Sequence, residues 1–120
     1  MKKLFISVPM KGRDHENILS SMKKIHKIAE ATVGEQLELI NSLIYEEAPA
    51  DSKEAIWFLG TSIKMMSSAD YVAIVRPHHE YSGCRVESMV ARTYKIPEIV
   101  IDREWVCPDI AEDLEEAFEL

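Results

Sequence analysis

Short apolar runs alternate with longer helical patterns along this chain. The runs cover residues 4–8, 37–40, 71–75 and 98–101. The first and third are almost continuously apolar, as expected for central strands that are buried on both faces. Strands that alternate with helices usually form a parallel sheet with helices on its faces. The pattern therefore predicts an α/β fold.

The first helical pattern lies between the first two runs. Asp14 is a candidate N-cap, because its side chain can accept a hydrogen bond from the first helical turn, and Gly34 is a candidate stop. Apolar residues recur between them at helical spacing, at Ile18, Met22, Ile25, Ala29 and Val33. The spacing predicts one long helix with a single buried face.

A second helix is expected to begin at Asp51 or Ser52, because Asp51 and Glu54 have the spacing of a capping box. It is expected to end near residues 67–68, after a connection at residues 42–50 that reads as a loop. Its predicted buried stripe consists of Ile56, Leu59, Ile63 and Met66.

A third helix is predicted from Ser82 to Tyr94, ended by Pro97, since the residue before a proline is pushed out of helical geometry. A fourth begins at Pro108, a favoured first-turn residue. It runs to the C-terminus, with Ile110, Leu114 and Phe118 as its buried side.

Right-handed crossovers between parallel strands limit how these elements connect. The most economical arrangement is a three-layer, flavodoxin-like fold, with a parallel sheet of four or five strands in the order 2-1-3-4 and helices on both faces. We expect a single domain over residues 1–120. The ligand crevice of such a sheet lies at the carboxyl ends of the first and third strands, where residues 9–14 and 76–83 meet.

The charge of the chain narrows the class of partner. There are 21 Asp and Glu residues against 14 Lys and Arg residues, which gives a net charge of −7. Nucleic acids and anionic membranes bind basic surfaces, so we expect neither as a partner. A small molecule or another protein fits this charge better.

Two cysteines, Cys84 and Cys107, lack the paired spacing of a zinc site or a disulfide framework. We therefore predict reduced thiols, no metal and no cofactor. The apolar stretch at residues 4–10 is too short for a signal sequence or a membrane span. These features predict a soluble, cytoplasmic protein.

The loop after the first strand is the first candidate binding site. It joins a strand to a helix N-terminus, whose free N–H groups and dipole favour an anion, and Lys11 and Arg13 strengthen that preference. With the single glycine Gly12, however, the loop is neither a Walker loop nor a dinucleotide fingerprint. An ordinary strand-to-helix turn is the alternative.

The beginning of the third helix is the second candidate. Ser82 can cap the helix, Gly83 can let a ligand approach the backbone, and Glu87 brings a carboxylate one turn further on. Helical spacing groups Glu87 with Gly83, Ala91 and Tyr94, and we expect Val86 and Val90 to face the core. A surface glutamate that favours the helix dipole is the alternative for Glu87.

Other polar residues fit structural roles better than chemical ones. Asp70 opens the third strand, where acids often cap or pair. His78 and His79 are adjacent and therefore point apart, so a metal site is disfavoured. Cys84 has no visible base partner, which argues against a nucleophilic thiol.

Taken together, these segments make the chain similar to the nucleoside 2-deoxyribosyltransferase-like superfamily, and most of all to a small bacterial and phage branch that opens with a strand followed by Gly-Pro-Met-Thr-Gly. The opening here is FISVPMKG at residues 5–12. The later signature is SADYV at residues 68–72, followed by GCRVE at residues 83–87. The resemblance extends through Ile101.

The resemblance implies a flavodoxin-like fold in which Glu87 attacks the anomeric carbon of a 2-deoxyribosyl group. The nucleobase leaves, and the sugar passes to water or to a second base. This is a retaining glycoside displacement. The implied ligand is a nucleoside or nucleotide. The implied substrate-binding residues are Pro9, Met10, Gly12, Arg13, Ser62, Ser82, Gly83 and Arg85.

Three positions depart from the family pattern. Phe5 stands where a first-strand tyrosine orients the nucleophile, and Ser62 stands near an aspartate that binds the sugar. Val8 replaces a small glycine. Three functions therefore remain open: an N-glycosidase or 2-deoxyribosyltransferase, a nucleotide-binding or sensing module without turnover, or an interaction protein with no small ligand.

Family members often complete the pocket from a neighbouring subunit. The chain also has apolar residues on the expected outer side of the fold, namely Trp57, Phe58 and Trp105. We therefore expect a homodimer or a higher homo-oligomer.

Overall fold

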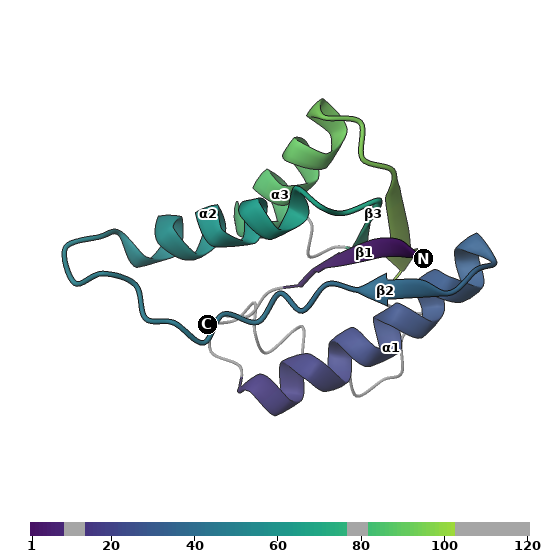
Figure 1. Ribbon diagram of the computed structural model, residues 1–120, viewed down its shortest axis with the longest axis horizontal. Coiled ribbons are helices and arrows are strands. Elements are labelled where there is room, and N and C mark those ends of the chain that lie inside the picture. Colours follow the sequence, from purple (N-terminus) through teal and green to yellow (C-terminus); the bar gives the residue numbers. More distant parts are fainter. Residues whose placement is uncertain (9–13, 77–81, 103–120) are drawn as a thin grey trace.

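Four parallel strands form the central sheet of the molecule (Figure 1). The computed structural model describes residues 1–8, 14–76 and 82–102. Helices and strands follow one another in the order β1 (Lys2–Ser7), α1 (His15–Val33), β2 (Leu37–Leu39), α2 (Glu54–Met66), β3 (Tyr71–Arg76), α3 (Ser82–Thr93) and β4 (Glu98–Asp102). The fourth helix predicted from Pro108 lies outside the described residues.

The strand order is β2-β1-β3-β4, and every pairing is parallel. This confirms the predicted α/β, flavodoxin-like arrangement, and the strands end within two residues of their predicted bounds. Ser7 pairs with Ile74, which pairs in turn with Val100. Because paired residues of a parallel sheet point to the same side, these three side chains form one row across the sheet.

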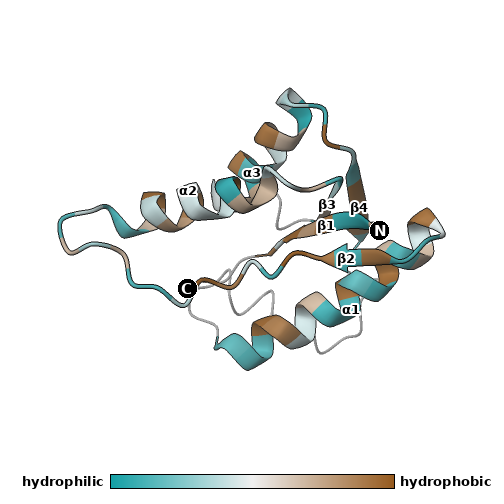
Figure 2. Ribbon diagram, viewed as in Figure 1, coloured by the Kyte–Doolittle hydropathy of each residue, from teal (hydrophilic) through white to brown (hydrophobic). Residues whose placement is uncertain are grey.

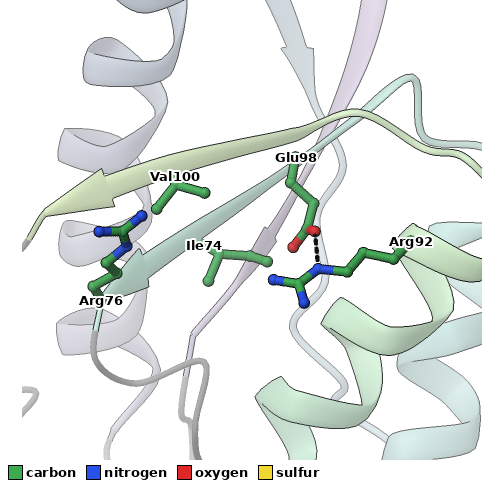
Figure 3. Close-up of a pocket in the computed structure, with 5 residues that line it drawn as sticks. All are labelled: Ile74, Arg76, Arg92, Glu98 and Val100. Carbon is green, nitrogen blue, oxygen red and sulfur yellow. Dashed lines mark hydrogen bonds and ion pairs between the residues drawn. The ribbon is translucent and has the colours of Figure 1, made fainter.

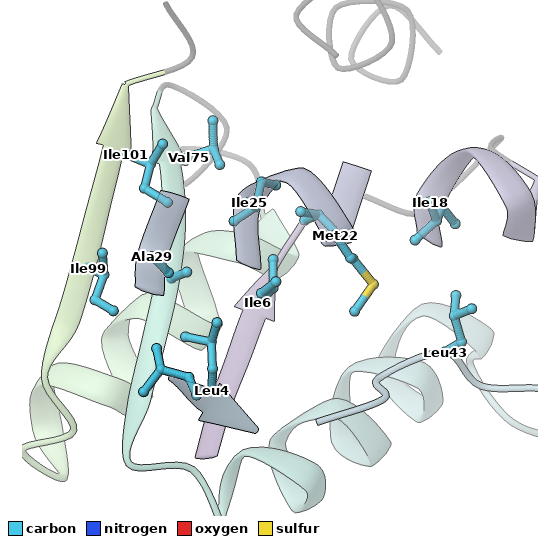
Figure 4. Packing of buried hydrophobic residues seen from close by; sticks show 13 residues of the cluster. Leu4, Ile6, Ile18, Met22, Ile25, Ala29, Leu43, Val75, Ile99 and Ile101 are labelled. Atoms are coloured by element: carbon cyan, nitrogen blue, oxygen red, sulfur yellow. The ribbon is translucent and has the colours of Figure 1, made fainter. Parts of the chain in front are cut away.

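Helices cover both faces of the sheet, with α1 on one side and α2 and α3 on the other (Figure 1). The core beneath α1 is large and apolar (Figure 4). Its buried residues are Leu4, Ile6, Val8, Ile18, Met22, Ile25, Ala29, Leu37, Leu43, Ala73, Val75, Ile99 and Ile101. The core on the other face is smaller and contains Phe5, Met66, Val72, Ile74 and Ala91.

Helix α1 begins and ends where the sequence predicts. The Asp14 side chain accepts a hydrogen bond from Asn17 N at 2.7 Å, and Gly34 takes the left-handed conformation, with φ of 76°. Glycine adopts that conformation without the steric penalty of a side chain. Hydrophobic and hydrophilic residues alternate along α1 in Figure 2, which matches its single buried face.

Helix α2 departs from the prediction at its beginning. It starts at Glu54, and Lys53 occupies the N-cap without a side-chain bond, so the predicted capping box is wrong. Ser52 instead bonds to Pro49 O through both its hydroxyl, at 2.6 Å, and its backbone N–H, at 3.0 Å. Ser52 therefore closes a turn before the helix.

The predicted buried stripe of α2 is also wrong in part. Met66 is buried, but Ile56 is 64% exposed, and Leu59 and Ile63 are half-buried. The first turns of α2 lie beyond the strands, which leaves them little to pack against among the described residues (Figure 1).

Side chains fix two strand ends. Lys3 N donates to Asp70 Oδ2, and Asp70 N donates to Lys3 O, both at 2.8 Å, which confirms a structural role for Asp70. At β2, Leu37 N donates to Glu30 Oε2 at 2.8 Å, and His26 Nε2 donates to Leu37 O at 2.7 Å. Two α1 side chains thus hold the backbone of Leu37.

In the described part of the chain, no helix combines the length and apolarity that crossing a membrane would require.

Candidate functional site

Glu87 lies inside α3 with its carboxyl group turned toward the end of β1. Only 7% of the residue is exposed. Ser7, the last residue of β1, donates a hydrogen bond from Oγ to Glu87 Oε1 at 2.8 Å, and both residues are buried. A carboxylate therefore stands at the carboxyl end of a central strand, where ligands of open α/β sheets bind.

The buried face of α3 agrees with the prediction only in part. Its buried residues are Cys84, Glu87, Ser88 and Ala91, whereas Val86 and Val90 are half-buried, and Val90 packs against the core as predicted. The positions 84, 87, 88 and 91 follow ideal helical spacing. Two of them are polar, so the stripe does not appear as a hydrophobic pattern, and the alternative of a surface glutamate is excluded by the burial of Glu87.

Burial raises the pKa of Glu87 from 4.5 to about 7, and the hydrogen bond from Ser7 opposes part of that rise. The cause is desolvation, because water stabilises a charged carboxylate far better than a protein interior does. A buried glutamate with a pKa near neutrality, at a strand end, is characteristic of functional sites.

Cys84 shares this environment but does not share its chemistry. Burial raises the pKa of its thiol to about 12, the negative charge of Glu87 raises it further, and a hydrogen bond with Ser7 lowers it. The thiol is therefore protonated at neutral pH. Because the thiolate is the nucleophilic form, Cys84 is unsuited to attack a substrate.

Ser7 is the residue that sequence reasoning missed. Phe5 is buried among apolar residues on the same face of β1, two positions before Ser7, and so has no polar role. Residue 5 is a phenylalanine and supplies no hydroxyl, but Ser7 supplies one to Glu87. The available signal was a single serine inside the run Leu4 to Val8, on the same face as Phe5 by strand alternation.

Three of the other predicted binding residues, Ser82, Gly83 and Arg85, lie at the beginning of α3, before Glu87. Ser82 is the first residue of α3 and is exposed, and Arg85 is exposed one turn before Ser88. Gly83 is half-buried, and a Cβ there would meet no atom of the described residues within 4 Å, which leaves room beside the backbone.

Ser62 is half-buried on α2, the helix that packs against α3, and makes no hydrogen bond with the described residues. Val8 packs into the core beneath α1, on the sheet face opposite Ser7. The remaining predictions, Pro9, Met10, Gly12 and Arg13, fall outside the described residues. His78, His79, Cys107 and Trp105 do so too.

Residues 1–8, 14–76 and 82–102 contain no group of three or more His, Cys, Asp and Glu side chains that could hold a metal ion.

No model of a protein family matches the chain, and neither a curated protein nor a solved structure does. The resemblance to the nucleoside 2-deoxyribosyltransferase-like superfamily stays a prediction from sequence motifs.

Proposed function

We propose that the chain is a nucleoside or nucleotide N-glycosidase or 2-deoxyribosyltransferase, with Glu87 as its nucleophile. One observation carries the proposal: a buried glutamate at the end of β1, held by Ser7, with a pKa near neutrality. Gly83, one helical turn before Glu87, supports it, because a Cβ there would meet no atom of the described residues and a ligand could approach this part of the backbone.

In the proposed reaction, Ser7 holds Oε1, and Oε2 attacks the anomeric carbon. The bond between that carbon and the nucleobase nitrogen breaks, and its electron pair leaves with the base, which takes a proton from water. A second water molecule, or a nitrogen of a second base, then attacks the same carbon, and the bond to Glu87 breaks with its electron pair on the carboxylate. The attacking group gives its proton to the hydroxide that the first step left.

The near-neutral pKa of Glu87 suits a nucleophile. A carboxylate of higher basicity is a better nucleophile, and about half of it is ionised at pH 7 when the pKa is about 7. The Ser7 hydrogen bond favours the ionised form and fixes its orientation, which reduces the entropy lost on reaching the transition state.

The test is a panel of 2-deoxynucleosides and their 5′-monophosphates assayed for release of the free base, with Glu87→Ala as the comparison. Release that disappears in the variant supports the proposal. Release that persists in Glu87→Ala would show that another group attacks the sugar.

A nucleotide-binding or sensing module is the second candidate. The observations that favour it are Phe5, which has no hydroxyl, and Ser62, which has no carboxylate, since Glu87 then has a hydrogen bond from Ser7 but no acidic neighbour on α2. Saturable binding of a nucleotide without base release would support this function. The absence of binding and of release for the whole panel would contradict both.

We also propose that the protein is a cytoplasmic homodimer or higher homo-oligomer. The supporting feature is α2, on which Ile56 is exposed and the edge-to-face pair Trp57 and Phe58, with ring centroids 5.1 Å apart, is half-buried. Sedimentation velocity at micromolar concentration tests it, and a monomer would contradict it.

A further inference from the structure

A shallow hollow on the α3 side of the sheet is separate from Glu87. Its volume is about 170 Å³, and its lining comes from β3, β4 and α3 (Figure 3). Ile74 and Val100 form an apolar floor, with Arg76 at one end and Arg92 and Glu98 at the other (Figure 3). A cavity of roughly 150 Å³ accommodates a six-membered ring, so the hollow has room for a ring-sized group.

Arg92 is held in place at its inner nitrogen. Nε donates to Glu98 Oε1 at 2.7 Å, and Ser88 Oγ donates to the other carboxylate oxygen, Oε2, at 2.8 Å. The terminal amino groups of Arg92 make no hydrogen bond with the described residues. Figure 3 shows the guanidinium group reaching from Glu98 toward Ile74. The donors of Arg92 are therefore positioned before any ligand arrives.

Arg76 has no partner of its own in the described part of the chain, where it makes neither a hydrogen bond nor an ion pair. Two guanidinium groups and one carboxylate give the lining a net charge of +1, although the chain as a whole carries −7. Asp102 pairs with Arg76 in the sheet register, so what the hollow offers a ligand is guanidinium donors and not an excess of positive charge.

We propose that this hollow binds a phosphate monoester whose organic group rests on Ile74 and Val100. The phosphate is bonded by the terminal amino groups of Arg92 and by Arg76, whose exposed side chain turns inward from the other end of the hollow to reach it. A phosphate monoester presents three oxygens, enough for two guanidinium groups at once, and arginine donors match phosphate geometry in bidentate fashion. The apolar floor accounts for the organic part.

The row Ser7, Ile74, Val100 separates this site from Glu87. Ser7 lies on one side of β3 and Val100 on the other. Neighbouring strands are about 4.8 Å apart, so Ser7 and Val100 are about 10 Å apart. The Ser7–Glu87 pair lies toward β1, and the hollow lies toward β4. The proposal therefore stands independently of the proposed catalytic function.

The experiment is an NMR titration of the full chain with ribose 5-phosphate, with ribose as the uncharged control, at constant ionic strength. We expect saturable shifts at the amide of Val100 and at the Nε signals of Arg76 and Arg92, and none with ribose. Arg76→Gln and Arg92→Gln should each weaken binding by about tenfold, because each removes a charge-assisted bond. The affinity of Arg76→Lys should lie between those of the parent chain and Arg76→Gln, since lysine keeps the positive charge but lacks the paired donors of a guanidinium group.

Lys27→Gln is the matched control, because it removes one exposed positive charge from α1 on the opposite face and should leave binding unchanged. Glu87→Gln distinguishes the two sites, because Glu87 does not line the hollow. Binding that is lost in Glu87→Gln would assign the ligand to the other site and overturn the proposal.

Two further outcomes would overturn it: no saturation at about 10 mM ligand, or binding that neither arginine variant weakens. If Arg92→Gln unfolds because Glu98 loses its partner, Arg76→Gln decides alone, since Arg76 is exposed and supports no other side chain. Equal affinity for inorganic phosphate would contradict the role of the apolar floor.

Discussion

The two faces of the sheet are built from different chemistry. Among the described residues, the face beneath α1 has an apolar cluster of thirteen buried residues, to which α1 adds the buried hydroxyl of Ser21. The face beneath α2 and α3 has five such residues, and beside them lie the buried polar side chains of Ser7, Glu87 and Ser88. Burying a carboxyl group lowers stability unless something compensates. The comparison indicates that one face stabilises the fold while the other holds the proposed site at some cost in stability.

The largest expected effect is the loss of base release in Glu87→Gln. We expect a fall of at least about a thousandfold, as for removal of a nucleophile in other enzymes, because the amide does not attack the sugar. The amide keeps the volume of the side chain and can still accept the bond from Ser7, so the melting temperature should not fall. The measurement is initial rates with equal amounts of folded protein.

The matched control for that variant is Glu38→Gln, which removes an exposed carboxylate from β2. Its rate of base release should equal that of the parent chain. A comparable loss of rate in both variants would mean that overall charge, and not Glu87, controls the reaction.

A substitution in the core beneath α1 should instead lower stability without changing the pH dependence of the reaction. Ile25→Ala should lower the free energy of unfolding by about 2–5 kcal/mol, because it leaves a cavity in the larger core. The pH dependence of base release in the remaining folded protein should not change. Chemical denaturation measures the first effect, and the pH–rate profile measures the second.

Ile56→Ala is the control for that substitution. Ile56 is 64% exposed, so its truncation should change the free energy of unfolding by about 0.5 kcal/mol or less. A loss as large as that of Ile25→Ala would mean that the beginning of α2 is covered in solution.

The next effect is a dependence of the free energy of unfolding on pH, which arises from Glu87 on the face beneath α3. The pKa of Glu87 rises from 4.5 to about 7 on folding, so the folded state binds the proton more tightly than the unfolded state. Below about pH 4.5 both states are protonated and nothing is lost. As the pH rises through about 7, the folded state loses about 3 kcal/mol of stability relative to a chain without this group.

Denaturation of the parent chain and Glu87→Gln across this pH range measures that loss. The difference between their free energies of unfolding should grow in favour of Glu87→Gln and level off above about pH 7. A difference that does not depend on pH would mean that Glu87 titrates as an ordinary exposed acid.

The smallest effect is expected for Ser7→Ala. Removing the bond to Glu87 Oε1 removes a stabiliser of the charged form, so the pKa of Glu87 should rise further. If Glu87 is the nucleophile, the rate increases with pH through its pKa. The midpoint of that increase should then move upward, with a loss of about tenfold at pH 7.

Ser7→Thr keeps a hydroxyl and should restore the midpoint at least in part. A rate that falls as the pH rises through about 7 would assign Glu87 the role of a general acid. That result would contradict the nucleophilic mechanism while leaving the site in place.

The fold was predictable because hydrophobic patterns report burial. The continuous run at residues 71–75 marked a central strand, and Asp14 and Gly34 marked the ends of α1 through their side-chain chemistry. The order 2-1-3-4 followed from the handedness of crossovers. None of these inferences needed a contact between distant residues.

The site was predictable in part. Glu87 was chosen because it follows a strand and a glycine, but its burial was not foreseen, because Cys84, Glu87, Ser88 and Ala91 form a stripe of mixed polarity. Its partner Ser7 is 80 residues away in sequence, and only the fold joins them. The capping box at Asp51 failed for a local reason, since a turn centred between Pro49 and Ser52 competes for the same residues.

The bonds from α1 to Leu37 have a consequence for solubility. β2 is an edge of the described sheet, and an open edge invites the strand of another molecule to pair with it. Leu37 N and O are already bonded to Glu30 and His26. An incoming strand would have to displace both side chains before it could pair at Leu37. Helix α1 therefore protects the edge strand β2 from edge-to-edge aggregation at this residue, in addition to burying the core.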